Sequence, residues 1–253
     1  MEAGLSATLA LLAAAAQPAT PEIDRIRLAP PTGIYVETDY REAQQDPACD
    51  WYASAETLLE ASPDERPTTP RGCKVAVRLR GVLNQAGADR FDALTELLDS
   101  EDGVPTRVVL NSRGGDAAAA LRIAQRIRNH PLYRRADGGV ATVIDPSHTA
   151  VCFSACLIVF AAGFERHAEF GIDGDAELPS RLGIHSPAHF DRDRSSYDTA
   201  HDNRNIQLVR RRLVDFFRSV DVDARIVDDM FAVPFDRIHL LTRAEAQGYR
   251  LVD

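Results

Sequence analysis

Hydrophobic and polar residues follow regular patterns from residue 74 to the C-terminus. Residues 75–79 (VAVRL) alternate apolar and polar positions as a half-buried strand does, and residues 106–110 (TRVVL) are a short β-branched strand. Between them, residues 89–98 place apolar side chains three to four positions apart, which predicts a helix. Strands and helices are therefore expected to alternate.

The alternation continues along the rest of the chain. Further strands are predicted at residues 139–144 and 181–185, and further helices at Ala117–Asn129, at 154–162, at 203–220 and after the capping box at 242–245. Residues 154–162 are apolar on every side, so this helix is expected to be buried. We predict an α/β fold of repeated parallel β-α-β units with a C-terminal helical segment. Right-handed crossovers then place strand C-termini and helix N-termini at one edge of the sheet, where ligands bind.

The first 72 residues lack this regularity. Residues 5–16 (LSATLALLAAAA) are an unbroken small-apolar run, as long as a signal-peptide core and too short to span a bilayer. Glu2 and no basic residue precede the run, so an alanine-rich helix is the alternative. We expect a signal peptide at 1–16, an N-terminal arm at 17–72 with a strand at 33–37 and a helix at 53–60, and an α/β domain at 73–253.

Composition limits the classes of function. Hydrophobic residues make up 45% of the chain and charged residues 26%, which is enough for a sizeable core and excludes wholesale disorder. The formal net charge of −9 argues against a nucleic-acid scaffold, which needs a basic face. No later run of about 18 apolar residues exists, so no integral membrane span is expected.

The chain has four cysteines, and an even number fits an oxidising compartment. Cys49 and Cys73 bracket a polar segment that contains prolines, and we expect them to pair. Cys152 and Cys156 lie close enough in sequence to pair with each other. The alternative is four buried thiols in a cytoplasmic protein. With disulfides and a leader, the expected location is periplasmic or secreted.

A glycine-rich loop is the first candidate for chemistry. Residues 111–116 (NSRGGD) join a predicted strand to a predicted helix. Gly114 and Gly115 allow backbone conformations that point N–H groups outward, at a position where such groups bind anions or a developing oxyanion. The alternative is a tight turn that needs glycine only for its backbone angles.

Ser154 and His185 are the candidate reacting side chains. Ser154 opens the all-apolar helix, and His185 closes an apolar strand, so both are expected at the ligand-binding edge. A histidine there is able to take the serine proton. The alternatives are a serine that only caps its helix and a buried, hydrogen-bonded histidine. The other histidines lie in polar contexts without metal-ligand spacing, so no metal is expected.

Taken in order, these motifs resemble the proteolytic subunit of Clp protease and its relatives within the crotonase-like fold. The family's strand–SPGG–helix element resembles residues 110–115 (LNSRGG), its nucleophile segment resembles 152–163 (CFSACLIVFAAG), its strand-borne histidine before proline resembles 184–187 (IHSP), and its C-terminal segment resembles 242–253. An arginine just beyond the nucleophile segment matches Arg166. The C-x-S-A-C form with a leader is closest to a branch of bacterial periplasmic relatives. The resemblance covers roughly residues 74–253.

The resemblance implies a serine hydrolase site and no cofactor. Ser154 is the expected nucleophile and His185 the general base, while the N–H groups of Gly115 and Ala155 form the oxyanion hole. The loop residues Gly114 and Arg113 are expected to contact substrate, with Arg113 in place of the family's proline.

The family's acidic residue aligns with Ile238, and the nearest carboxylate is Asp236. The site is therefore either a triad that includes Asp236 or a dyad. The resemblance also implies a peptide or protein substrate and a homo-oligomer.

The leading hypothesis is a secreted or periplasmic serine peptidase. The alternative is a catalytically inactive binding module of the same fold that recognises a peptide or protein partner, as the missing aspartate and Arg113 suggest. Acyl-CoA chemistry is disfavoured by a Ser/His pair and a secretion signal. A Ser–Lys dyad would need Lys74, the chain's one lysine, and a thiol-redox centre is disfavoured by the CxxxC spacing of Cys152 and Cys156.

Overall fold

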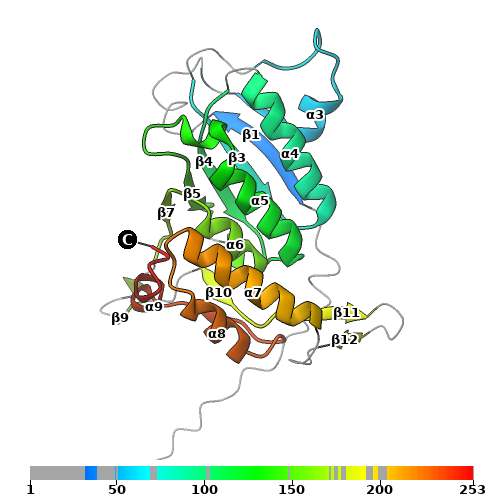
Figure 1. Cartoon of the computed structure of the whole chain (residues 1–253). Helices are drawn as coiled ribbons and strands as arrows, with labels where there is room; N and C mark the ends of the chain where they lie inside the picture. The colour runs from blue at the N-terminus through cyan, green and yellow to red at the C-terminus, as the bar shows by residue number, and fades with distance from the viewer. Residues whose placement is uncertain are drawn as a thin grey trace, which may run out of the picture.

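The computed structural model describes residues 32–38, 49, 51–68, 73–100, 103–147, 149–170, 172–173, 176–177, 181–191, 196–198 and 204–252. The expected signal peptide at 1–16 lies outside these residues, as does the start of the expected N-terminal arm. Within them, helices pack around two sheets (Figure 1).

The larger sheet has six strands in the order β2-β1-β3-β4-β5-β7. Its strands are β1 (Gly33–Thr38), β2 (Tyr52–Ser54), β3 (Val75–Arg80), β4 (Pro105–Asn111), β5 (Ala141–Ile144) and β7 (Glu165–His167). Strands β3, β4, β5 and β7 pair in parallel, and β1 pairs antiparallel with both β2 and β3. The sheet is thus mainly parallel, as the sequence predicts.

A second sheet carries the strands that precede the candidate side chains. It consists of β13 (His239–Leu240), β10 (Leu182–Ile184) and β6 (Cys152–Phe153), with β10 parallel to β6 and antiparallel to β13. An isolated parallel bridge between Ser112 and Cys152 links this sheet to the end of β4. Two hairpins, β8–β9 (Ile172–Asp173 and Ala176–Glu177) and β11–β12 (His189–Asp191 and Ser196–Asp198), complete the strands of the described residues.

Helices cover the larger sheet and form most of the C-terminal part. They are α3 (Ala55–Glu60), α4 (Gln85–Ser100), α5 (Ala117–Asn129), the 3-10 helix η2 (Pro131–Arg134), α6 (Ala155–Ala161), α7 (Arg204–Ser219), α8 (Arg225–Ala232) and α9 (Arg243–Gly248). Figure 1 shows α4 and α5 side by side over one face of the sheet. Every residue of α6 is buried, as its all-apolar sequence predicts. None of the described helices combines the length and apolar character that crossing a membrane requires.

The predicted α/β class with a C-terminal helical segment is confirmed, and three details differ. The helix expected at 53–60 begins at Ala55, because Ser54 ends β2 and its hydroxyl accepts the Thr57 N–H at 3.1 Å. Helix α8 and the short polar strand β7 were not predicted. Strand β1 pairs with β3 over its whole length, so this part of the expected arm shares a sheet with the α/β domain.

Both expected cysteine pairs are disulfides. Cys49 bonds to Cys73 with Cα atoms 5.7 Å apart, and Cys152 bonds to Cys156 with Cα atoms 5.1 Å apart. No free cysteine is found among the described residues. The prediction of two disulfides is confirmed, and the two pairs together indicate an oxidising compartment.

The Cys49–Cys73 disulfide closes a segment of 24 residues, so it restricts the unfolded chain. We predict that the double variant Cys49→Ala/Cys73→Ala has a free energy of unfolding lower by about 3 kcal/mol. Urea unfolding of the oxidised proteins measures this difference. Equal midpoints and slopes for variant and wild type would contradict it.

A buried carboxylate joins the ends of the parallel strands. Asp145 follows β5, and its side chain, only 4% exposed, forms ion pairs with Arg78 and, at 3.2 Å, with Arg80. Arg78 also pairs with Glu37 of β1. Burial acts to raise the pKa of Asp145, but the hydrogen bond from the Ser147 N–H and the charge of Arg78 outweigh it and lower that pKa. Folding therefore favours the ionised carboxylate.

We predict that Asp145→Asn lowers the free energy of unfolding by about 2 kcal/mol at neutral pH, because Arg78 and Arg80 lose a buried partner. A carboxyl group whose pKa is depressed on folding stabilises the protein above its unfolded pKa of about 3.9 and loses that effect as pH falls through the folded value. The difference from wild type should therefore shrink below about pH 4. Urea unfolding at pH 7 and pH 3 tests this, with Asp64→Asn on the surface as control. A pH-independent difference would refute the prediction.

Candidate active site

Ser154 lies in a strained turn between β6 and α6. Its backbone angles are φ 54° and ψ −123°, a region that residues with side chains rarely adopt. Its hydroxyl makes no capping hydrogen bond with α6. Asp116 and Thr242 do cap their helices through their side chains, and both have negative φ. Ser154 thus occupies the N-cap position of α6 without capping the helix through its side chain, and its role as nucleophile stays a prediction.

Hydrogen bonds from two neighbouring segments hold this turn. The Ser154 N–H donates to the Gly183 carbonyl at 2.8 Å, and the Phe153 N–H donates to the Ser112 carbonyl at 3.0 Å. One residue earlier, the Cys152 N–H donates to the Arg181 carbonyl at 2.8 Å. The backbone around Ser154 is thus fixed from both sides.

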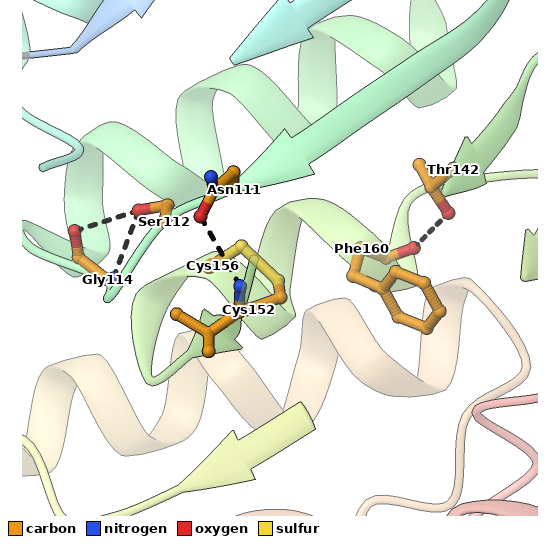
Figure 2. Close-up of a disulfide and its surroundings, with 8 residues drawn as sticks. Asn111, Ser112, Gly114, Thr142, Cys152, Cys156 and Phe160 are labelled. Carbon is orange, nitrogen blue, oxygen red and sulfur yellow. Dashed lines mark hydrogen bonds between the residues drawn. A yellow bond between two sulfur atoms is a disulfide. The ribbon is translucent and has the colours of Figure 1, made fainter. Parts of the chain in front are cut away.

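The glycine-rich loop after β4 is shaped by Ser112. The buried Ser112 hydroxyl accepts the Gly114 N–H at 3.0 Å and contacts the Gly114 carbonyl oxygen at 3.3 Å (Figure 2). The Leu83 N–H donates to the Gly114 carbonyl, and the Asp116 N–H donates to the Leu83 carbonyl, at 2.8 and 2.9 Å. The part played by Ser112 was not predicted from the sequence. Its signal is a serine two residues before a glycine, the spacing at which a serine hydroxyl bonds to the backbone of its own turn.

This loop lies directly against Ser154. Gly114 and Gly115 have φ of 99° and 138°, which favour glycine. A Cβ atom on Gly114 would lie 2.8 Å from Ser154 Cβ and 3.1 Å from the Ala155 nitrogen, so no larger residue fits there. The Asn111 side chain adds a further tie, because its oxygen accepts the Val151 N–H at 3.3 Å (Figure 2).

Two backbone N–H groups lie on the segments that contact each other at Ser154. Within the described part of the chain, no hydrogen bond is found for the N–H groups of Gly115 and Ala155. Ala155 begins α6, and the first N–H groups of a helix have no acceptor within it. Two backbone donors beside a serine are the arrangement that stabilises an oxyanion.

His185 follows β10 at the same edge as Ser154. In the β6–β10 pair, Cys152 lies opposite Leu182 and Phe153 opposite Gly183, so His185 comes one residue beyond the position facing Ser154. His185 is 7% exposed, and its Nδ1 lies 2.8 Å from the Ser186 carbonyl oxygen. Because a carbonyl only accepts hydrogen bonds, Nδ1 carries the proton and Nε2 of the neutral ring is the basic nitrogen.

Ile238 occupies the position where the family resemblance predicts an acidic residue. In the antiparallel β10–β13 pair Ile184 lies opposite His239, so Ile238 falls opposite His185. A Cβ atom on Gly183 would lie 2.6 Å from Ile238 Cγ2, which places that side chain against β10. Asp236 is exposed, and it has no hydrogen bond or ion pair with another described residue. Its role as a third catalytic residue stays a prediction.

The remaining candidates lie apart from this site. Lys74 precedes β3 and therefore lies at the amino end of the parallel strands, about 20 Å of strand away from the edge that bears Ser154. A groove of about 1210 Å³ on the sheet, lined by Lys74, Arg78, Arg107 and His167 among others, contains neither Ser154 nor His185. Among the described residues, no group of three or more His, Cys, Asp or Glu is placed to hold a metal.

Comparisons with known proteins find similarity in structure alone. No protein-family model matches the chain, and no curated protein is similar enough to count as a match. A variant of the 1510-N membrane-bound stomatin-specific protease, in complex with a substrate peptide, is 16% identical with a TM-score of 0.45 over 70% of this chain and 72% of its own. ClpP1 from Listeria monocytogenes is 20% identical with a TM-score of 0.44 over 68% of this chain and 84% of its own.

A Clp-protease subunit is thus among the structural neighbours, as the sequence motifs predict, while the closer likeness to bacterial periplasmic relatives stays a prediction. Similarity at this level carries no argument about function, which has to come from the residues of this chain.

We predict that Gly114→Ala destabilises the protein by about 3 kcal/mol, since the new Cβ meets Ser154 and the φ of 99° is strained for alanine. Gly248→Ala is the matched control, because nothing lies within 4 Å of a Cβ there, and we expect no loss of stability and a gain of at most about 1 kcal/mol from the helix propensity of alanine. Thermal and urea unfolding of both variants make the comparison. Similar losses in the two would show that the glycine loop is not packed as described.

Proposed function

We propose that this protein is a serine hydrolase with Ser154 as its nucleophile and His185 as its general base. The observation that carries the proposal is the strained Ser154, whose hydroxyl is not used as a helix cap. Residues kept in sparsely populated backbone regions cluster at active sites, where the rest of the structure holds them. Gly115 and Ala155 lie on the two segments that meet at Ser154, and within the described residues their N–H groups have no hydrogen-bond partner.

The chemistry follows the general serine mechanism. The Ser154 Oγ forms a bond to the carbonyl carbon of the substrate and passes its proton to His185 Nε2. The N–H groups of Gly115 and Ala155 stabilise the negative oxygen that develops. His185 then returns the proton to the leaving group as the scissile bond breaks, and water releases the acyl group from Ser154 by the same route.

The Ser186 carbonyl orients the proposed base. It accepts the Nδ1 proton of His185 and so selects the tautomer that catalysis needs.

Peptides or proteins are the proposed substrates, and the sequence resemblance to Clp-protease subunits is what favours them. The half-buried Arg113 and the buried Gly114 form part of the loop beside Ser154, where we expect a bound chain to lie. The two disulfides support folding in an oxidising compartment, and the apolar leader supports a secreted or periplasmic location. A homo-oligomer is proposed as well, with α7, which exposes Leu208, as a docking face.

We predict that residues 17–253, expressed and oxidised, react with a fluorophosphonate probe at Ser154. Ser154→Ala should abolish labelling, and His185→Gln should slow it by roughly 10²- to 10⁴-fold because the base is lost. Ser100→Ala is the matched control, since its exposed hydroxyl lies at the end of α4. In-gel fluorescence and peptide mapping measure the rates and the labelled residue. A folded wild-type protein that does not react would overturn the proposal.

That negative outcome would favour a binding module, the second candidate. Its support is Ile238, an apolar residue opposite His185 where the resemblance expects an acid. A binding module should bind peptides equally well after Ser154→Ala. Titration of a peptide library against both proteins distinguishes the two candidates.

A further inference from the structure

The Cys152–Cys156 disulfide spans the turn that holds Ser154. Cys152 lies in β6 two residues before the serine, and Cys156 lies in the first turn of α6 two residues after it. Both cysteines are fully buried, and their Cα atoms are 5.1 Å apart (Figure 2). The bond therefore links the end of β6 to the start of α6, with Ser154 at the centre of the loop that it closes.

The strained angles of Ser154 require such a restraint. In a relaxed turn the residue before a helix adopts extended angles and caps the helix, as Thr242 does before α9 with φ −71° and ψ 164°. Two extended steps, from 152 to 154, would already cover roughly 6.6 Å. A disulfide bridges Cα separations up to about 6.8 Å, so the bond leaves little room for the chain to extend further between Cys152 and Cys156. The bond therefore opposes the relaxed, capping conformation of Ser154.

We propose that Cys152 and Cys156 are positioning residues whose disulfide keeps the Ser154 hydroxyl in its reactive orientation. This inference rests on the proposed serine hydrolase function. Without the bond the turn relaxes, the hydroxyl caps α6, and the serine loses reactivity while the fold persists. A fully buried hydroxyl cap is the ordinary state of a serine at this position in a helix.

The redox state of this pair is then set during folding. Forming the bond removes one proton and one electron from each thiol and passes them to an external disulfide, which is reduced to two thiols. Once the chain is folded, both sulfur atoms are shielded from solvent, so reductants reach them only when the protein opens. A chain that folds in a reducing compartment would therefore carry two buried thiols and an unreactive Ser154.

The test compares two disulfide deletions in the full α/β chain. Cys152→Ala/Cys156→Ala removes the proposed restraint, and Cys49→Ala/Cys73→Ala removes a disulfide elsewhere as the matched control. We expect the first variant to react with the fluorophosphonate probe about 10- to 100-fold more slowly than wild type, and the second to react at the wild-type rate. For an activated ester substrate, kcat should fall by the same factor with KM unchanged, which a loss of stability alone would not produce. Circular dichroism verifies folding.

A second measurement uses the native cysteines. The Cys49→Ala/Cys73→Ala protein is refolded with and without reductant, and thiol counting establishes the state of Cys152 and Cys156. The reduced protein should label slowly, and reoxidation should restore the rate.

Equal labelling rates with and without the bond would overturn the inference and leave the proposed function standing. Failure of both bond-free forms to fold would also overturn it, because positioning requires an intact fold. An oxidised wild type that does not label would instead overturn the proposed function itself.

Discussion

The architecture around Ser154 depends on three backbone segments that meet at one turn. Next to the parallel pair of β6 and β10, the Ser154 N–H donates a hydrogen bond to the Gly183 carbonyl. At the bridge between β6 and the end of β4, the Phe153 N–H donates to the Ser112 carbonyl. These bonds position the residues on either side of Ser154, and the Cys152–Cys156 disulfide spans the turn itself. As a result, the residue that begins a buried helix keeps a positive φ, which an isolated turn of this sequence would not adopt.

Two features explain how the surrounding structure tolerates this strain. Helix α6 is buried along its whole length, so its N-terminus is fixed by packing and not by a side-chain cap. At its other end, the Arg166 guanidinium donates to the carbonyl oxygens of Ala161, Val220 and Arg250 at 3.4, 3.2 and 3.0 Å. Arginine suits this position because its five N–H groups reach several acceptors at once. The arginine that the family resemblance points to thus joins α6 to the ends of α7 and α9.

The surroundings of Asp145 are charged, whereas the residues described around His185 are mostly apolar. Asp145, Arg78 and Arg80 form a network that is paired at every charge, next to the loop that leads into β6. Around His185, strand pairing places Ile238 opposite the histidine, and the centroid of the Phe235 ring lies 6.5 Å from that of the imidazole. The Ser186 carbonyl oxygen, 2.8 Å from Nδ1, orients the imidazole.

Much of this was determined by the sequence alone. Apolar periodicity predicted β3, β4, α5 and α6 within a few residues, because local patterns reflect which face of each element is buried. The capping box at Thr242 and both disulfides were also predicted correctly. Ser154, His185 and the two glycines were singled out because, taken in order along the chain, their segments resemble motifs of Clp-protease subunits.

Only the tertiary structure determined the backbone conformation of these residues and which of them lie next to one another. The positive φ of Ser154, the ST-type turn at Ser112 and the position of Ile238 opposite His185 all follow from pairing between segments distant in the chain. The local sequence does not predict such pairing. From the local sequence alone, a serine before an apolar helix is expected to be a helix cap. The difference between a cap and a candidate nucleophile is a backbone rotation, and it depends on contacts that the local sequence pattern does not record.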